Sequence, residues 1–324
     1  MPAQNSNNSR STNLLKKSTM QKNTVLIILI LSCSIGGLTA QEKTIDLPIL
    51  KGPYLGQEPP GMTPEVFAPG IISTDESEGS SGFARNGQVY IFQRFINRDC
   101  HTYMMTMTDN IWSQPKLIPF WKQLIHNGDL IFSPDDKTMF YQVKQQVSDR
   151  LDSDIWQAIL GQEGWTSRCA LPPPINSSYN ESFASITKNG KLYFFSQRPG
   201  GLGESDLYMS KYINGDYTVP INLKTLNTQY HEWDPFIAPD ESYIIFCSTK
   251  PGGSGMDDLY ISFRNQEDQW CAPINMGNQF NSPGSENRPY VSNDGKYLFY
   301  TSTRKGNRDI WWVDAKIIDE LRPE

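Results

Sequence analysis

The segment ENRPYVSNDGKYLFYTSTRKGNRDIWWVD, from Glu286 to Asp314, contains the clearest copy of a pattern that recurs along the chain. A Glu opens an extended stretch and an Asp-Gly type of turn follows. An apolar strand, a Ser-x-Arg loop and an Asp-hydrophobic-aromatic strand complete the unit. The turn ends at five positions that lie 49 to 54 residues apart: Gly87, Asp136, Gly190, Glu241 and Gly295. A period of this length with several strands per unit predicts a β-propeller.

The repeat predicts an all-β fold, a single five-bladed β-propeller of four-stranded antiparallel blades over residues 64 to 316. The last unit has no fourth strand, since a short tail, 317 to 324, follows its third one. The segment from Val66 to Ile72 resembles a fourth strand and precedes the first unit. We expect this N-terminal strand to pair with the segment around Ile310, completing the last blade and closing the ring. Residues 41 to 63 are predicted to form an irregular lead-in.

The first 40 residues have the pattern of a secretory signal peptide. An apolar run from Val25 to Leu31 is too short to span a bilayer, and small residues precede a cleavage site after Ala40. A start at Met20 leaves a complete signal, and Cys33 after Ile-Leu-Ser gives a loose lipobox as the alternative to ordinary cleavage. The segment contains no acidic residue and four basic ones: Arg10, Lys16, Lys17 and Lys22. Export to the periplasm or the extracellular space is therefore expected, with no transmembrane segment in the mature chain.

Composition narrows the possible partners. Cleavage after Ala40 changes the formal charge from −6 to −10, because only basic charges are removed. An acidic chain lacks the basic footprint that nucleic-acid binding requires. The remaining cysteines have no C-x-x-C spacing, which argues against a zinc site, and their positions differ from blade to blade, which favours buried thiols over disulfides: Cys100, Cys169, Cys247 and Cys271. The chain is expected to be a monomer without a cofactor.

The units resemble the PD40 or TolB-type WD40-like propeller repeat, whose pattern runs Glu-x-x-Pro, Ser-Pro-Asp-Gly, strand, Ser-x-Arg, Asp-Ile-Tyr. The resemblance covers residues 64 to 316 and is closest in the last two units. It departs from the pattern at Asn127, where a Glu is expected, and at His101, which replaces the Asp. It implies an exported bacterial propeller of a family that mostly binds or scaffolds, although some relatives are polysaccharide lyases. Resemblance of this kind points to a fold more than to an activity.

Two columns of residues ring the predicted channel mouth, because the first strand of each blade is innermost in a propeller. The residues that open this strand are Glu78, Asn127, Glu181, Glu232 and Glu286. The residues two positions further on are Ser80, Asp129, Phe183, Asp234 and Arg288. The recurring Glu has two interpretations, a ligand-binding acidic ring or a structural residue that bonds to neighbouring backbone amides.

The residues flanking the mouth differ from blade to blade, so the architecture does not require them. They are Tyr179, Tyr230, His231 and Trp233. Aromatic rings beside carboxylates suit sugars, because rings stack on them and acids accept bonds from hydroxyl groups. The basic residues that end second strands, such as Arg198, are expected to pair with the Asp residues that start third strands, such as Asp206.

Three functions remain open. The leading hypothesis is a non-catalytic propeller that binds a glycan or an envelope protein at an acidic, aromatic-lined mouth. The first alternative is a glycosidase or polysaccharide lyase using Asp129, Glu232 and Asp234, an interpretation that loses support if Glu181 and Glu232 bind backbone amides. The second is a protein-interaction scaffold. No catalytic motif is present, and a divalent-metal site at His126, His231 and Asp234 is only weakly indicated.

Overall fold

The computed structural model describes residues 47 to 323 except 98, 119–125, 148–149 and 162–163. The predicted signal peptide, the alternative start Met20 and the lipobox Cys33 lie outside the described residues. Within the described ranges, no helix is long and apolar enough to cross a membrane. The four cysteines that follow the predicted cleavage site are free thiols. Their predicted burial holds for Cys247, whereas Cys169 is exposed and the other two are half-buried.

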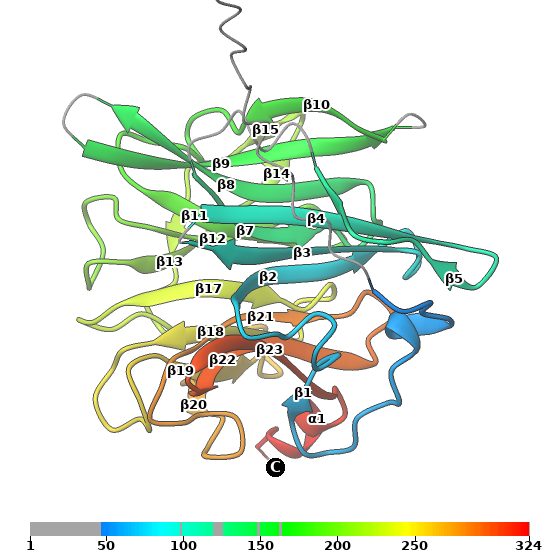
Figure 1. The fold of residues 1–324 in the computed structure, drawn as a ribbon. Coiled ribbons are helices and arrows are strands. Elements are labelled where there is room, and N and C mark those ends of the chain that lie inside the picture. The colour runs from blue at the N-terminus through cyan, green and yellow to red at the C-terminus, as the bar shows by residue number, and fades with distance from the viewer. Residues whose placement is uncertain (1–46, 98, 119–125, 148–149, 162–163, 324) are drawn as a thin grey trace, which may run out of the picture. The chain divides into compact units, whose positions relative to one another are not determined.

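Five antiparallel sheets confirm the predicted five-bladed β-propeller (Figure 1). The first blade comprises β2 (Ser77–Ala84), β3 (Val89–Ile96), β4 (Asp99–Thr108), β5 (Ile111–Trp112) and β6 (Lys116–Leu117). The second comprises β7 (His126–Phe132), β8 (Thr138–Val147), β9 (Arg150–Gly161) and β10 (Gly164–Ala170). The third comprises β11 (Glu181–Ile186), β12 (Leu192–Ser196), β13 (Asp206–Ser210) and β16 (Ile221–Asn222), with the hairpin of β14 (Tyr212–Ile213) and β15 (Asp216–Tyr217) beyond it.

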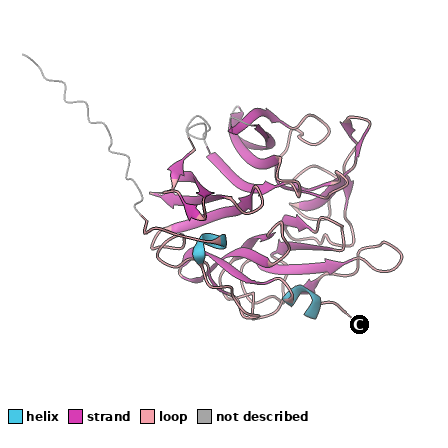
Figure 2. Cartoon of the chain, turned by 90° about the vertical axis from the view of Figure 1, so that its right-hand side faces the viewer, coloured by secondary structure: helices cyan, strands magenta, loops and turns pink. Residues whose placement is uncertain are grey.

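The fourth blade comprises β17 (Glu232–Ile237), β18 (Tyr243–Ser248), β19 (Asp258–Phe263) and β20 (Ile274–Asn275). The fifth comprises β21 (Glu286–Val291), β22 (Tyr297–Lys305), β23 (Asn307–Asp314) and, as its outermost strand, β1 (Glu65–Val66). The first strands of successive blades contact one another around the ring, and β2 contacts both β21 and β23. Apart from these strands, the described residues contain only two short helical segments (Figure 2).

Ring closure by the N-terminal strand is confirmed. β1 pairs antiparallel with β23, Glu65 opposite Trp312 and Val66 opposite Trp311. The Phe67 amide donates a hydrogen bond to the Ile310 carbonyl over 2.8 Å. This pairing covers the edge of the last blade, which would otherwise expose unpaired backbone groups.

Aromatic packing seals the junction between the last blade and the first. The ring of Phe67, which is fully buried, lies 5.0 Å from Trp312, 5.3 Å from Phe299 and 6.1 Å from Phe83 between centroids. Truncating such a buried aromatic side chain costs about 3–5 kcal/mol of unfolding free energy. The junction therefore holds the five blades in the fixed ring that the central site requires.

The lead-in packs against the same junction, and the tail packs against the hydrophobic core. The lead-in contains the 3-10 helix η1 (Pro53–Gly56), and the ring of Tyr54 lies 4.9 Å from that of Phe83. The tail contains α1 (Ile317–Glu320), in which Ile317 and Ile318 are buried. Both segments cover apolar surface of the propeller, so they contribute to its core.

Candidate binding site at the channel mouth

Every first strand contains a β-bulge just after its opening residue. The ladder register shifts between Glu78 and Ser81 in the first blade, and one residue further along in the other four blades, as between Ser182 and Ser185. In four blades the residue two positions after the opening one has a positive φ: Asp129 (46°), Phe183 (49°), Asp234 (51°) and Arg288 (55°). A non-glycine residue pays a conformational cost for this geometry, which re-aims its side chain. We call these positions, together with Ser80, the bulge column.

Three residues of the bulge column, Asp129, Asp234 and Arg288, line one cavity of about 480 Å³. All five blades contribute to it, so it lies on the axis of the ring, at the end where first strands begin and second strands end. Its lining comprises Phe95, Cys100, Gly128, Asp129, Gln142, Lys144, Phe195, Trp233, Asp234, Asn287, Arg288 and Arg308. Pockets of this size that combine aromatic faces with a few polar groups are typical small-ligand sites.

Arg288 links the two carboxylates of the cavity. Its Nε donates to Oδ1 of Asp129 over 3.0 Å, and its backbone amide donates to Oδ2 of Asp234 over 3.3 Å. The Ser182 hydroxyl donates to the second oxygen of Asp129 over 3.0 Å. Residues from four of the five blades thus form one network across the axis, with Asp129 neutralised by a cation and Asp234 held by a backbone amide.

The electrostatics of this network separate the two aspartates. Burial and the nearby Asp129 charge raise the pKa of Asp234 to about 7, although Arg288 opposes the shift. Burial and the Arg288 charge lower the pKa of Arg308 to about 10. Asp234 is therefore partly protonated near neutral pH, while Arg308 stays charged although its surroundings disfavour a charge.

The prediction of an acidic mouth is wrong about the balance of charges, because cations outnumber carboxylates in the cavity lining. The described lining contains two carboxylates, Asp129 and Asp234, and three cations, Lys144, Arg288 and Arg308. Of the predicted aromatic residues Tyr179, Tyr230 and Trp233, Trp233 lines the cavity and the two tyrosines do not. Phe95 and Phe195, which were not predicted, line it as well. The sign of the charge differs because the recurring glutamates do not reach the cavity.

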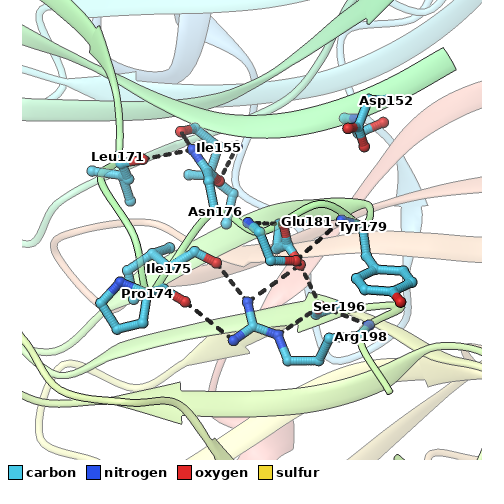
Figure 3. Close-up of polar contacts among 12 residues, drawn as sticks. Asp152, Ile155, Leu171, Pro174, Ile175, Asn176, Tyr179, Glu181, Ser196 and Arg198 are labelled. Carbon is cyan, nitrogen blue, oxygen red and sulfur yellow. Dashed lines mark hydrogen bonds and ion pairs between the residues drawn. The ribbon is translucent and has the colours of Figure 1, made fainter. Parts of the chain in front are cut away.

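Glu181 shows where the recurring glutamates point (Figure 3). Its side chain is fully buried and accepts hydrogen bonds from the Ser177 amide (2.8 Å), the Ser177 hydroxyl (2.7 Å) and the Ser196 hydroxyl (2.5 Å). Arg198 adds an ion pair at 3.2 Å. All of these partners belong to the same blade or to the loop that enters it, so the carboxylate fixes the loop to the strand.

The other three glutamates repeat this arrangement. Glu78, Glu232 and Glu286 are fully buried. Each accepts hydrogen bonds from the amide and the hydroxyl of the residue four positions earlier, respectively Thr74, Thr228 and Ser282. Glu181 and Glu232 therefore both bind backbone amides, the observation that argues against Glu232 as a catalytic group.

The expected ion pair between Arg198 and Asp206 is not formed. The Arg198 guanidinium instead donates to the Pro174 and Ile175 carbonyls over 3.1 and 2.5 Å, besides pairing with Glu181 (Figure 3). Asp206 accepts the backbone amides of Leu202 and Gly203, in the glycine-rich loop before it, over 2.5 and 3.1 Å. Each charged side chain is therefore bound by backbone groups of a neighbouring turn and does not pair with the other.

The flanking residues lie at different depths. Trp233 lines the cavity, and the His231 ring lies 5.3 Å from the Trp233 ring. The His231 Nε2 is 3.6 Å from an oxygen of Glu204. Tyr230 is half-buried in the loop before β17, and Tyr179 is exposed in the loop before β11.

Two further candidates, the side chains of His126 and Asn127, lie outside the described residues. In the described part of the chain no group of three His, Cys, Asp or Glu side chains could hold a metal ion. The weakly indicated metal site therefore gains no support from His231 and Asp234. The His231 ring instead lies beside that of Trp233, and Asp234 belongs to the hydrogen-bonded network of the cavity.

The sequence does not predict several residues of the cavity. Lys144 lies near the end of a second strand and Arg308 near the start of a third, where they reach the same mouth from the outer side of the bulge column. Phe95 and Phe195 also end second strands. Their position at strand ends that face the mouth could have indicated that they line the cavity. The residue type at those positions differs from blade to blade, so no repeated pattern marks them.

Comparison with known proteins supports the fold and leaves the function open. No family model matches the chain, and no curated protein matches it significantly. Among solved structures, TolB from Acinetobacter baumannii is 15% identical over 74% of this chain and 55% of that one, with a TM-score of 0.45. The chain thus spans little more than half of that TolB.

Two sugar-processing enzymes are also among the similar structures. The endo-arabinase from Bacteroides thetaiotaomicron VPI-5482 is 13% identical over 79% of this chain and 97% of that one, with a TM-score of 0.50. The α-L-arabinofuranosidase from Lactobacillus brevis is 10% identical over 74% and 92%, with a TM-score of 0.48. At these identities the likeness concerns the propeller fold alone, and the PD40 assignment of the repeat stays a prediction.

Proposed function

We propose that this chain is an exported, non-catalytic binding propeller that holds a glycan in the cavity at its channel mouth. Export rests on the signal-peptide pattern of residues 1 to 40. The observation that carries the binding function is the bulge column, where strained backbone aims Asp129, Asp234 and Arg288 into one cavity. Backbone strain of this kind concentrates at ligand sites.

The size and lining of the cavity favour a sugar over a protein partner. A volume of about 480 Å³ fits one or two sugar rings, whereas a folded partner needs a broad surface. Trp233 offers a ring for stacking, while Asp234 and Asn287 offer acceptors and donors for hydroxyl groups. An envelope protein would enter such a cavity only with a single side chain or a chain end.

Glycoside hydrolysis is the second candidate, and one observation favours it. Asp234, with its pKa near 7, lies in the same network as the Arg288-bound Asp129, and glycosidases pair a protonated with an ionised carboxyl group. The pairing of Asp129 with Arg288 and the burial of Glu232 make this function second to binding.

A glycan array combined with product detection on the same purified protein tests these functions. Retention of a glycan without products supports binding, and product formation lost in Asp234→Asn supports hydrolysis. The array is repeated with Trp233→Ala and Asp234→Ala, which alter the cavity, and with Tyr212→Ala, an exposed aromatic substitution on the outer hairpin. Unchanged retention in the first two variants would contradict the proposed site and leave a scaffold that works through its rim.

A further inference from the structure

We infer that the cavity binds its ligand through an oxyanion, a carboxylate or sulfate group on the glycan, held at Arg308 with Lys144 beside it. This inference rests on the proposed function, since it names the chemical class of the glycan. It is argued from the charges that line the cavity, because some of them are paired with one another and two cations are not.

The cations and carboxylates of the cavity do not balance. Arg288 is paired with Asp129, and its backbone amide bonds to Asp234, so these three groups satisfy one another. Neither Arg308 nor Lys144 forms an ion pair with any other described residue, although both line the cavity. Two cations therefore remain for a ligand once the internal network is complete.

Arg308 in particular is held in an unfavourable state. Its Nε is buried and has no hydrogen-bond partner among the described residues. The acids that act on Arg308 do not neutralise its charge. Asp129 is bound by Arg288, and Asp234 is partly protonated. Asp257 is bonded to the Ser285 hydroxyl. A charged group with a buried donor that has no partner is destabilised, and an anion in the cavity beside the guanidinium offsets its charge.

The geometry of a guanidinium specifies the kind of anion. Its donors form a planar fork that matches the two oxygens of a carboxylate or two oxygens of a sulfate ester. A lysine ammonium adds a second positive charge without a directional requirement. Trp233 and Phe195 line the same cavity and provide apolar faces for the ring of the sugar that carries the anion.

The test compares matched sugars by titration calorimetry on the full chain. The probes are glucuronic-acid oligosaccharides, the same oligosaccharides with each carboxyl group reduced to an alcohol, and neutral oligosaccharides that carry a sulfate ester. For the wild-type protein we expect the acidic or the sulfated probe to bind about tenfold or more tightly than the reduced one. The sulfate and uronate arms distinguish the two sources of the oxyanion.

Variants of Arg308 make the test specific. Arg308→Gln is expected to abolish the preference for the anionic probe without weakening the reduced one, and Arg308→Lys to retain part of the preference. Lys305→Gln is the matched control, because it removes an exposed cation of the same hairpin that does not line the cavity. A melting curve of each variant separates a lost anion contact from a lost fold.

Two results would overturn the inference. If the wild-type protein binds anionic and reduced probes equally, or if Arg308→Gln keeps the preference, the oxyanion site does not exist. Binding of the reduced sugar that is lost in Trp233→Ala would then leave the proposed glycan function standing. Absence of binding to every saccharide would overturn the proposed function together with the inference.

Discussion

The recurring glutamates and the bulge column stand two residues apart on the same strands and have opposite roles. The glutamate is the same in four blades, fully buried, and bound to groups of its own blade and the loop that enters it. The bulge column has four residue types in five blades, adopts strained φ values in four of the blades, and places Asp129, Asp234 and Arg288 in the cavity. Residues that repeat with the architecture hold the propeller together, and those that break the repeat form its site.

The largest expected effect comes from removing a recurring glutamate. Glu181→Ala leaves the Arg198 charge and the buried Ser177 and Ser196 groups without their partner, and breaking such a buried pair costs about 3–5 kcal/mol. Urea unfolding followed by tryptophan fluorescence measures the loss. Glu204→Ala removes an exposed acid and should change stability by less than about 0.5 kcal/mol. Equal, small losses in both variants would contradict the structural role of the glutamates.

Substitution of the cavity aromatic should affect binding more than stability. Trp233→Ala removes the stacking face and should weaken glycan binding about tenfold or more, because aromatic contacts with a ligand depend on buried area and ring geometry. Affinity is measured by titration of the glycan that the array retains best, and unfolding is measured in parallel. A variant that binds normally would place the ligand away from the bulge column.

The pH dependence of stability reports on Asp234. Its pKa lies near 7 in the folded protein and has an ordinary value of 3.8, so the folded state holds this proton more tightly than the unfolded state. Stability from this group is therefore present below about pH 4 and is lost as the pH rises toward 7, by at most about 1.4 kcal/mol per pH unit. Asp234→Asn should flatten the curve over this interval.

The comparison with wild type isolates Asp234 from other groups that titrate in the same range. Burial also raises the pKa of Glu78 to about 7 and that of Asp154 to about 6, so both contribute to the wild-type curve. These contributions are common to the two proteins and cancel in the difference. Identical slopes for wild type and Asp234→Asn would show that folding does not raise the pKa of Asp234.

The smallest effect is expected at the predicted site residues that lie outside the cavity. Tyr179 is exposed in its loop, and Tyr230 bonds to Gln229 at the surface. Tyr179→Phe and Tyr230→Phe should each change glycan affinity by less than about twofold, since neither residue lines the cavity. Surface plasmon resonance on immobilised glycan can resolve such a difference. A loss as large as that of Trp233→Ala would extend the site to the loops of the mouth.

The fold can be predicted from the sequence because the same pattern of strands and turns occurs in five units. Local sequence patterns specify the turn, the strands and the closing segment of the ring. Phe67 of the closing segment packs against Trp312 at the junction between the last blade and the first. The structural role of the glutamates was also available in the sequence. A Ser or Thr stands four residues before each of them, and the pair recurs as a unit: Thr74, Ser177, Thr228 and Ser282.

The cavity is less predictable for a physical reason. A β-bulge redirects a side chain through a backbone φ that Asp234 or Arg288 adopts under the constraint of the whole ring, and no local pattern specifies it. Arg308 and Lys144 reach the cavity from different blades, and only the closed ring brings them together. The sequence therefore identified the bulge column and missed the cations that change the charge of the site.

The most direct test is a crystal structure of the protein soaked with the glycan that the array retains best. The predicted result is electron density for a sugar in the channel-mouth cavity, with Trp233 against its ring and Asp234 and Arg308 within hydrogen-bond distance of its polar groups. Density for the sugar on an outer blade edge, with the cavity occupied only by water, would contradict the account.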